Sequence, residues 1–486
     1  MVKYVDDFLN STTMYRLMLY FLITLLLIAL VLSIFGLLPF NPFDLFLSAV
    51  FLAAVCWVIN TILARVFYAP TNLESPYITA LILALIMTPV DSLDGLPTLF
   101  LIAFFAMASK YIVAIAKKHL FNPSAFAVAL GTITLNIGAS WWVGNIWMVL
   151  FVISGGILIV RKIKREKMTL IFLLTALAIV LIPSFLRGND LLVITQGLIL
   201  ESPIFFFAFV MLPEPQTSPS DKKMQIFYGV LVGLLYTRPE WALLAGNVFS
   251  YLVSPKEKLI LSLKKKIQIA PDIYDFLFSK SQKFIFLPGQ YLEWTLGHNN
   301  PDSRGNRRYF TIASSPTEDN LQIGVKFYPE SSSFKKALLS VDSKRIIVAS
   351  QLTGDFTLPE DQTKKLAFLA GGIGITPFRS MIKYLIDTDQ KRDIILLYSN
   401  KTAKDIVYKD IFKIAAWKLG IKTVYILTDK GKYIDAMMIQ KEMPDYKERV
   451  FYISGPHLMV DAFEKTLKDM GIFQNQIKVD YFPGYA

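Results

Sequence analysis

The sequence predicts three domains: a polytopic α-helical membrane domain over residues 1–254, an antiparallel β-barrel over 257–361 and a parallel α/β domain over 362–486. Three observations support this division. The 486 residues are 54% hydrophobic, with a mean hydropathy of +0.46, which is too apolar for an ordinary soluble protein. The apolar excess lies in the first half. Short alternating strands follow from residue 259, and strand-then-helix units follow from about 364.

Apolar segments of the first half predict about ten helices. Several segments are shorter than the ~20 residues that a straight span needs. We therefore expect broken helices and half-helices whose backbone lines an internal site. The segments are 16–38, 43–64, 76–90, 97–116, 121–137, 145–160, 169–186, 191–212, 225–237 and 240–253.

Loop charges predict the orientation of these helices. With the N-terminus inside, the inner loops carry Lys117, Lys118 and the run "RKIKREK" at 161–167, whereas an outer loop carries "DSLDGLP" at 91–97. This is the positive-inside bias. We expect a multi-pass protein of the cell's inner (cytoplasmic) membrane, with the C-terminal half in the cytoplasm. The net charge of +12 comes without a nucleic-acid motif, so it favours a lipid bilayer surface or a phosphorylated cofactor over nucleic acid.

Cysteine and histidine counts exclude two kinds of redox centre. The single cysteine, Cys56, cannot provide the four thiolates of an iron–sulfur cluster within one chain. The three histidines are too few and too dispersed for transmembrane bis-histidine haems. We therefore expect no haem, no iron–sulfur cluster and no metal site.

Two motifs in the second half carry binding chemistry. The strand "RRYFTIASSP" at 307–316 combines a guanidinium, which suits a diphosphate, with a flat ring and a hydroxyl. The turn "GGIGITP" at 371–377 follows an apolar strand and precedes a helix, so its glycines allow a pyrophosphate to approach free backbone N–H groups.

Four segments in this order, "RYFTIASSP", "GGIGITPFRSM", "YISGP" and "DYFPGYA", resemble the ferredoxin–NADP⁺ reductase family over 257–486. The resemblance implies FAD, with Arg308 on its diphosphate, Phe310 against the isoalloxazine and Thr311 near N5. A register shifted by one residue, with Arg307 and Tyr309, places a phenyl group where a hydroxyl is needed, so we favour the Arg308 register. The remaining flavin-binding candidates are Tyr309 of the same strand and Ser332 and Ser333 of "ESSSFKKAL".

The same resemblance implies an NAD(P)H site. Ser454 stands where many members have cysteine, and Phe482 or Tyr485 corresponds to the aromatic residue that covers the flavin or nicotinamide. We expect Thr311, Ser454 and Phe482 to be catalytic. NADH is favoured over NADPH, although Lys401 and Lys404 leave a 2′-phosphate possible. The nucleotide-binding candidates are Gly371, Gly372, Gly374, Thr376, Pro377, Gly455 and Pro456.

The first half has its own resemblance. "NLESPYITALILAL", "FNPSAFAVAL" and "MLPEPQTSPSDKKMQIFYGVLVGLLY" resemble the related flavin-carrying membrane subunits of the sodium-translocating NADH:quinone reductase and of the Rnf electron-transport complex. The resemblance implies a second flavin, FMN or riboflavin. The Ser-Gly-Ala-Thr-type motif whose threonine carries FMN in those subunits is absent from this sequence, so we expect a flavin held without a covalent bond, or a flavin site that is differently made. Its candidate ligands are Glu74, Asn122 and Thr217, with Asn72, Ser75, Pro123, Glu214 and Ser218 beside them. The alternative is that these polar groups cap broken helices.

Two further expectations concern where particular side chains lie relative to the membrane. Glu201, within an apolar segment, is a candidate for an ion or proton path, or for a structural role at a kink beside Pro203. Trp141, Trp142 and Trp147 are expected to form an interfacial belt.

Together these features predict a membrane-bound NAD(P)H-dependent flavin oxidoreductase. Electrons would pass from cytoplasmic NAD(P)H through FAD to a membrane flavin. The final acceptor would be a small molecule, a quinone or an extracytoplasmic flavoprotein. Two alternatives remain: a membrane-tethered NAD(P)H:flavin or ferredoxin-type reductase without transmembrane transfer, and a flavin transporter with a redox domain. The sequence does not fix the oligomeric state or ion translocation.

Overall fold

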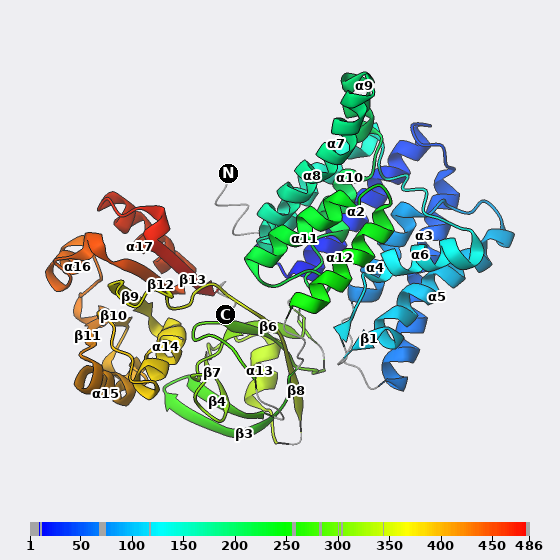
Figure 1. Ribbon diagram of the computed structural model, residues 1–486. Helices are drawn as coiled ribbons and strands as arrows, with labels where there is room; N and C mark the ends of the chain where they lie inside the picture. The colour runs from blue at the N-terminus through cyan, green and yellow to red at the C-terminus, as the bar shows by residue number, and fades with distance from the viewer. Residues whose placement is uncertain are drawn as a thin grey trace. The chain divides into compact units, whose positions relative to one another are not determined.

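The computed structural model describes residues 9, 12–67, 74–115, 118–254, 259–280, 284–299, 301–302, 305–343 and 345–482. The chain forms two compact units, Met1–Glu257 and Lys258–Ala486 (Figure 1). The first unit is helical apart from a two-residue ladder between β1 (Ala114–Ile115) and β2 (Lys118–His119). The second unit contains an antiparallel sheet and a parallel sheet. The predicted order of helical, antiparallel and parallel regions is therefore present.

Apolar helices make up the first unit, as the sequence predicts. Five are long and apolar enough to cross a membrane, and a sixth candidate is the bent pair Leu191–Leu200 and Ile204–Met211, which turns by 54°. The expected number of about ten spanning helices remains a prediction. The helices are α2 (Met14–Ile34), α3 (Pro42–Val66), α4 (Glu74–Ile86), α5 (Leu96–Ile112), α6 (Pro123–Leu135), α7 (Ile146–Ile163), α8 (Glu166–Leu186), α9 (Leu191–Leu200), α10 (Ile204–Phe206), α11 (Lys222–Leu234) and α12 (Pro239–Val253).

Two short helices, α4 and α6, are half-helices of the expected kind. Each has 13 residues, or roughly 20 Å at 1.5 Å per residue, against a bilayer core of about 30 Å. The C-terminal end of α4 lies inside the protein, where its carbonyl groups need partners. The backbone N–H of Trp141 donates to the Ile86 carbonyl at 2.9 Å, and the indole of Trp142 donates to the Met87 carbonyl at 2.9 Å. Trp142 is buried, so the prediction that it belongs to an interfacial belt is wrong. Its indole instead caps the C-terminal end of α4.

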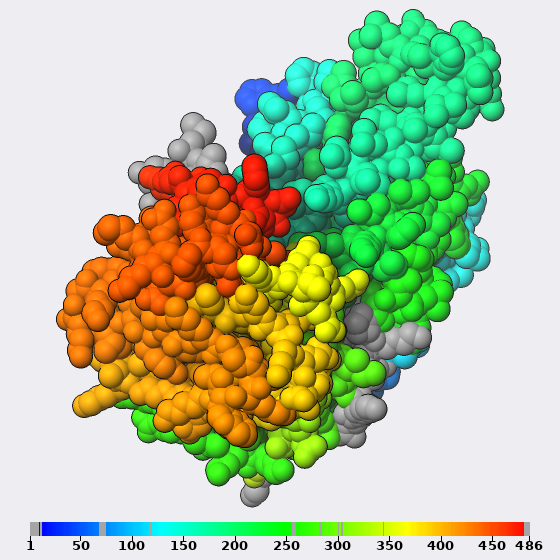
Figure 2. Space-filling view, turned by 60° about the vertical axis from the view of Figure 1, so that its left-hand side comes forward, coloured from blue at the N-terminus to red at the C-terminus, as the bar shows by residue number. Residues whose placement is uncertain are grey.

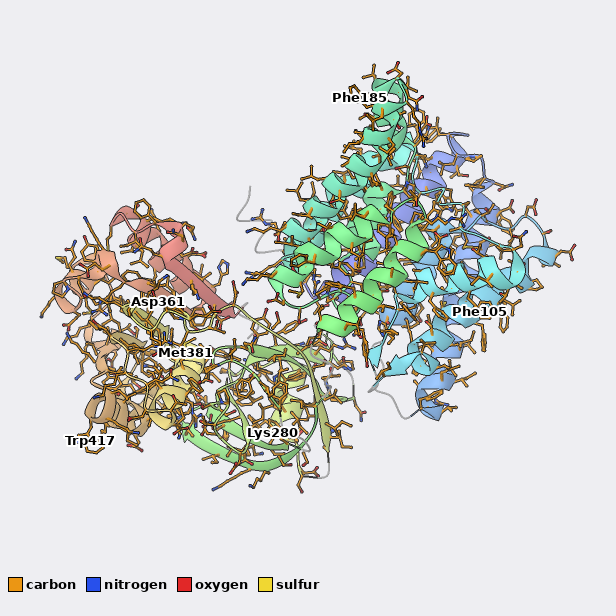
Figure 3. All side chains as sticks on the ribbon, viewed as in Figure 1. Phe105, Phe185, Lys280, Asp361, Met381 and Trp417 are labelled. Atoms are coloured by element: carbon orange, nitrogen blue, oxygen red, sulfur yellow. The ribbon has the colours of Figure 1, made fainter. Side chains whose placement is uncertain are left out.

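The turn between α8 and α9 projects beyond the other helices of the first unit (Figures 1 and 2). Phe185, labelled at this end in Figure 3, is 66% exposed, and α9 contains no buried residue. Such exposed apolar side chains are typical of a surface in contact with lipid. Glu201 caps the C-terminal end of α9 at the bend and is exposed on this unit.

The antiparallel sheet has the strand order β6-β5-β8-β3-β4-β7. Alternating residues of β3 are buried, which gives one face of the sheet an apolar core. In the described residues, β6 and β7 are the two edges of this sheet, and its closure into a barrel remains a prediction. The elements are β3 (Leu259–Ala270), β4 (Ile273–Lys280), β5 (Tyr291–Thr295), β6 (Arg307–Thr311), β7 (Leu321–Lys326), α13 (Ser333–Leu339) and β8 (Ile346–Thr353).

The parallel sheet has the order β11-β10-β9-β12-β13. Every residue of β9 is buried, as expected for a strand covered on both faces. Met381 of α14 is buried in the core, whereas Trp417 of α15 is 87% exposed; both residues are labelled in Figure 3. The elements are β9 (Leu366–Gly371), α14 (Thr376–Asp387), β10 (Ile394–Asn400), α15 (Lys409–Leu419), β11 (Lys422–Leu427), α16 (Ala436–Glu442), β12 (Val450–Pro456), α17 (His457–Asp469) and β13 (Ile477–Phe482).

The chain order reverses at β9, because β10 follows on one side and β12 lies on the other. In open parallel sheets, ligands bind outside the carboxyl ends of the strands at such a reversal. The turn after β9, residues 371–377, lies at this position.

Candidate functional site

Alternate residues of β6 point to opposite faces of the antiparallel sheet. The guanidinium carbon of Arg308 lies 5.3 Å from the centre of the Phe334 ring, and the Phe310 ring lies 6.0 Å from the same ring. Arg307 and Tyr309 instead reach Glu293, at 3.1 and 3.0 Å. The two possible registers of this motif are therefore separated in space, and Arg308 and Phe310 are the pair that shares a face with α13.

Arg308 lies beside a carboxylate and a serine at the start of α13. Its Nη2 is 3.6 Å from Asp302 Oδ1, and the backbone N–H of Ser333 donates to Asp302 Oδ2 at 2.9 Å. The Ser333 hydroxyl accepts from the Asp302 backbone N–H at 2.8 Å and lies 3.0 Å from His298 Nε2. These groups already hold one anionic group, the Asp302 carboxylate. They are therefore chemically suited to the diphosphate of FAD.

Ser332 has a different role from its neighbour. Its hydroxyl is buried and accepts from the backbone N–H of Lys335 at 3.4 Å, as an N-cap of α13. Ser332 therefore fixes the position of the helix, whereas the Ser333 side chain lies on the Asp302 side.

Thr311 connects β6 to the parallel sheet. Its buried hydroxyl donates to Asp480 Oδ2 at 3.3 Å, and Asp480 on β13 lies opposite Ser454 on β12. Ser454 is completely buried, and its hydroxyl has no hydrogen-bond partner among the described residues. Two of the three expected catalytic residues are thus brought together around Asp480, a residue to which the sequence motifs assigned no role.

The glycine turn after β9 lies against the end of β12. A Cβ on Gly374 would be 2.4 Å from the Ser454 carbonyl oxygen, so only glycine allows this approach. Gly372 has φ +53° and nothing within 4 Å of a Cβ position, which leaves open space above the turn. Gly371 and Gly455 flank the same crevice, where a Cβ on either would meet the Met459 side chain.

Helix α14 begins directly after this turn. Pro377 occupies its first turn, and the buried Thr376 donates its hydroxyl to the Ile373 carbonyl at 3.2 Å. The helix has 12 residues and its N-terminal N–H groups lie at the carboxyl edge of the sheet. This arrangement suits a pyrophosphate.

The remaining nucleotide-site candidates lie at the same edge. Pro456 pairs with Phe482, which places the backbone of Phe482 beside the second turn. The Phe482 side chain and all of Tyr485 lie outside the described residues. Lys401 and Lys404 follow β10 and are exposed.

The first unit contains a pocket that joins three segments that the sequence singled out. Ser75, Asn122 and Glu214 all line it. Asn122 Nδ2 donates to Glu214 Oε2 at 2.9 Å, and Asn122 Oδ1 accepts from the Ala125 N–H at 3.1 Å. Asn122 thus caps α6 and binds Glu214 as well, so the two roles that the sequence left open coexist in one side chain.

Not all of the candidates face this pocket. Glu74 lies 3.6 Å from Arg16 Nε, and Thr217 donates to Glu214 Oε2 at 3.0 Å. Neither is among the residues that line the pocket, and Asn72 lies outside the described residues. Thr217 therefore supports the Glu214 carboxylate.

Sequence reasoning missed two ionisable residues here. Lys110 of α5 lines the pocket and donates to Thr79 Oγ1 at 2.9 Å and to Ser75 Oγ at 3.1 Å. His119 Nε2 lies 3.4 Å from Glu214 Oε1. A lysine inside the apolar run 97–116 is the signal that would have found Lys110.

Comparisons with known proteins concern the second unit. Residues 368–465 match the family model of the oxidoreductase NAD-binding domain. The glycine betaine monooxygenase reductase subunit of Chromohalobacter salexigens is 28% identical over 223 residues, which are 43% of this chain and 59% of that protein. An NADPH oxidoreductase of Mycobacterium tuberculosis is 28% identical over 193 residues, which are 39% of this chain and 50% of that protein.

The chain therefore spans only a little more than half the length of these curated relatives. Among solved structures, ferredoxin–NADP⁺ reductase from Plasmodium falciparum with 2′P-AMP covers 46% of this chain and 97% of its own, at 19% identity and a TM-score of 0.40. Residues 368–465 of the second unit therefore match an oxidoreductase NAD-binding domain, and the second unit is similar in sequence to NAD(P)H-dependent reductases.

Proposed function

We propose that this chain is a membrane-bound oxidoreductase that takes electrons from cytoplasmic NAD(P)H through FAD to a flavin in the helical unit. From there they pass to an acceptor in or across the membrane. The single observation that carries the reductase part is the chain of contacts from Thr311 through Asp480 to Ser454. It joins the strand that would hold the flavin to the edge that would hold the nicotinamide.

On the FAD side, this chain supplies binding and orientation. Arg308 and Ser333 would hold the diphosphate in place of the Asp302 carboxylate, and Phe310 would give a stacking face. When bound, FAD accepts a hydride and releases electrons singly, which is chemistry that the amino acids here cannot provide. Thr311 would donate or accept a hydrogen bond at the ring edge, because a hydroxyl can do both.

On the nucleotide side, the turn at 371–377 and the start of α14 would hold the pyrophosphate. The unpartnered hydroxyl of Ser454 supports a nicotinamide position there, since buried hydroxyls are normally hydrogen-bonded. NADH remains the favoured nucleotide. Lys401 and Lys404 are exposed, so contact with solvent accounts for their positions as well as contact with the 2′-phosphate of NADPH would.

In the helical unit, the pocket beside Asn122 and Glu214 supports a second flavin, FMN or riboflavin, held without a covalent bond. We place the protein in the inner membrane with the second unit in the cytoplasm, and we propose that a quinone, a small molecule or an extracytoplasmic flavoprotein takes the electrons.

A sided assay tests this function. The purified chain is reconstituted into vesicles and those with the second unit outward are supplied with NADH, while a membrane-impermeant acceptor is trapped inside. We expect two flavins per chain and reduction of the trapped acceptor. One flavin per chain, with reduction of an external dye but not of the trapped acceptor, would instead show a tethered reductase. Uptake of flavin without NADH would show a transporter.

A further inference from the structure

The antiparallel sheet has an inner face, which holds its apolar core, and an outer face. Leu261 on β3 and Ile347 on β8 pair with each other and point into the core. The neighbouring pair, Ser262 and Ile346, therefore points outward, as does Ile260 two residues earlier. Ile260 is 43% exposed and Ile346 is 62% exposed. Two large aliphatic side chains thus lie on the outer face.

A tyrosine extends this apolar surface across two more strands. Ile260 pairs with Val348 and Val348 pairs with Thr295, so the outer face continues onto β5. Tyr309 of β6 pairs with Glu293, two residues from Thr295, and therefore points outward as well. Tyr309 is 48% exposed. The outer patch is defined here as the side chains of Ile260, Ile346 and Tyr309.

Basic residues surround the outer patch. The segment 255–266 contains five lysines and one glutamate, and it begins directly after Ser254, the C-cap of α12. Lys264 and Lys265 lie at the irregularity of β3 and are exposed, and the exposed Arg345 directly precedes Ile346. A polybasic segment that follows an apolar helix is typical of contact with anionic lipids.

Carboxylates near the outer patch already have partners. Glu293 pairs with Arg307 at 3.1 Å and accepts from the Tyr309 hydroxyl at 3.0 Å. Asp342 accepts from the backbone N–H of Arg345 at 3.1 Å. The lysines therefore give this surface an excess of positive charge. Aliphatic side chains, a tyrosine and lysines together have the composition of a protein surface that enters lipid headgroups.

We propose that the outer patch and the lysines of 255–266 dock the second unit onto an anionic lipid bilayer. This inference rests on the proposed function, which places the chain in a membrane. The lysines would attract the headgroups, and the outer patch would enter the headgroup layer. The inner face of the sheet is not available for this contact, because Phe334 and Leu338 of α13 pack into its core.

A fluorescent probe beside the outer patch tests this docking. Ser262→Cys is labelled with an environment-sensitive dye in the full chain, where Cys56 is completely buried. The chain is placed in nanodiscs of phosphatidylcholine, with or without phosphatidylglycerol, and a spin-labelled headgroup lipid serves as the quencher. Ser340→Cys is the matched control, because Ser340 is exposed at the end of α13, the helix that packs on the inner face.

We expect stronger quenching at position 262 than at position 340, and a further increase when phosphatidylglycerol is present. Replacing both Lys264 and Lys265 by Gln should lower the ratio of docked to undocked chains about 25-fold, or about fivefold for each lysine. Salt at about 1 M should also weaken docking, since the Debye length there is about 3 Å. Ile346→Ser should lower the ratio about tenfold and leave NADH-dependent dye reduction unchanged.

The outcomes separate the docking surface from the function on which it rests. Equal quenching at both positions would overturn the docking surface. So would quenching that responds to neither phosphatidylglycerol nor the lysine and Ile346 substitutions, because the covalent link to α12 alone would then account for it. A chain that does not enter nanodiscs would overturn the membrane placement itself. Quenching as expected, without reduction of a trapped acceptor, would support the docking surface and overturn transmembrane electron transfer.

Discussion

The Tyr408 hydroxyl donates a hydrogen bond of 2.6 Å to Asp275 Oδ1 and so joins the parallel sheet to the antiparallel sheet. Gln322 donates to the other carboxylate oxygen at 2.6 Å, and the Arg379 guanidinium lies 5.7 Å from the centre of the Tyr408 ring. Arg379 also pairs with Glu318 and donates to the Ala313 carbonyl at 2.9 Å. The segment that follows β6 is therefore fixed directly to α14, which follows the glycine turn.

Removing the hydroxyl from this contact should destabilise the second unit. Tyr408→Phe leaves Asp275 buried with one donor fewer, and the expected loss of unfolding free energy is about 1–3 kcal/mol. The measurement is thermal unfolding of the full chain followed by the increase of FAD fluorescence. Tyr425→Phe removes a hydroxyl from a side chain that is 37% exposed and serves as the control, with a change within about 0.5 kcal/mol.

The Asp275 carboxyl should also make stability depend on pH. Burial raises the pKa of Asp275, against the opposing effect of its hydrogen bonds from Tyr408 and Gln322. A carboxyl whose pKa is higher in the folded state binds its proton more tightly there. Its contribution to stability is thus greatest below the unfolded pKa of about 4 and is lost as the pH rises through the folded pKa.

Asp275→Asn isolates this effect, because asparagine does not titrate. The melting temperature of the wild type minus that of the variant should fall as the pH increases from about 4 to 7. Measuring the difference removes the contribution of other titratable groups that both proteins share. A difference that stays constant or rises over this range contradicts the assigned direction.

Neighbouring arginines on opposite faces of β6 offer a matched test of FAD binding. Arg308→Ala removes the guanidinium beside Ser333 and should weaken FAD binding by about tenfold to a hundredfold, the range for a charge-assisted hydrogen bond. Arg307→Ala removes the same charge from the Glu293 face and should retain FAD. The measurement is FAD content after gel filtration and the dissociation constant from fluorescence titration. Equal losses in both variants would show a general charge effect.

The sequence predicted the parts of the molecule whose structure follows from a local pattern of residues. Period-2 alternation in "RRYFT" is enough to place Arg308 and Phe310 on one face, and consecutive glycines after a buried strand are enough to place a turn at the sheet edge. The short apolar segments likewise correspond to the half-helices α4 and α6.

Contacts between distant segments were not predictable in the same way. Asn122 and Glu214 are 92 residues apart, and Thr311 and Asp480 are 169 apart, so no local period relates them. The prediction for Trp142 is wrong because the sequence around a tryptophan near the end of an apolar helix looks the same in two situations. The side chain can lie at a lipid interface, or it can cap the buried end of a short helix. Only the buried Met87 carbonyl distinguishes the two cases.

Thr311 should affect hydride transfer more than cofactor binding. Its hydroxyl lies between the position expected for the flavin ring and Asp480, so Thr311→Val removes a hydrogen-bonding group while keeping the shape of the side chain. We expect kcat for NADH-dependent dye reduction to fall by about tenfold to a hundredfold, with FAD content and KM for NADH nearly unchanged. Thr311→Ser keeps the hydroxyl and should restore most of kcat. If Thr311→Val loses FAD instead, the side chain is a binding residue only.

Gly374→Ala should weaken nucleotide binding, because Gly374 lies in close contact with the backbone at Ser454. A methyl group at Gly374 would lie 2.4 Å from the Ser454 carbonyl oxygen and 2.6 Å from the Gly455 Cα, so Gly374→Ala must push the two turns apart. Because both turns are backbone, neither can yield by a side-chain rotation. We expect KM for NADH to rise about tenfold or more while FAD remains bound, since the displaced turn no longer presents its N–H groups in register. Gly297→Ala, with nothing within 4 Å of its Cβ position, adds the same methyl group without a clash and should leave KM unchanged. A Gly374→Ala enzyme with the wild-type KM would mean that the nucleotide binds away from this turn.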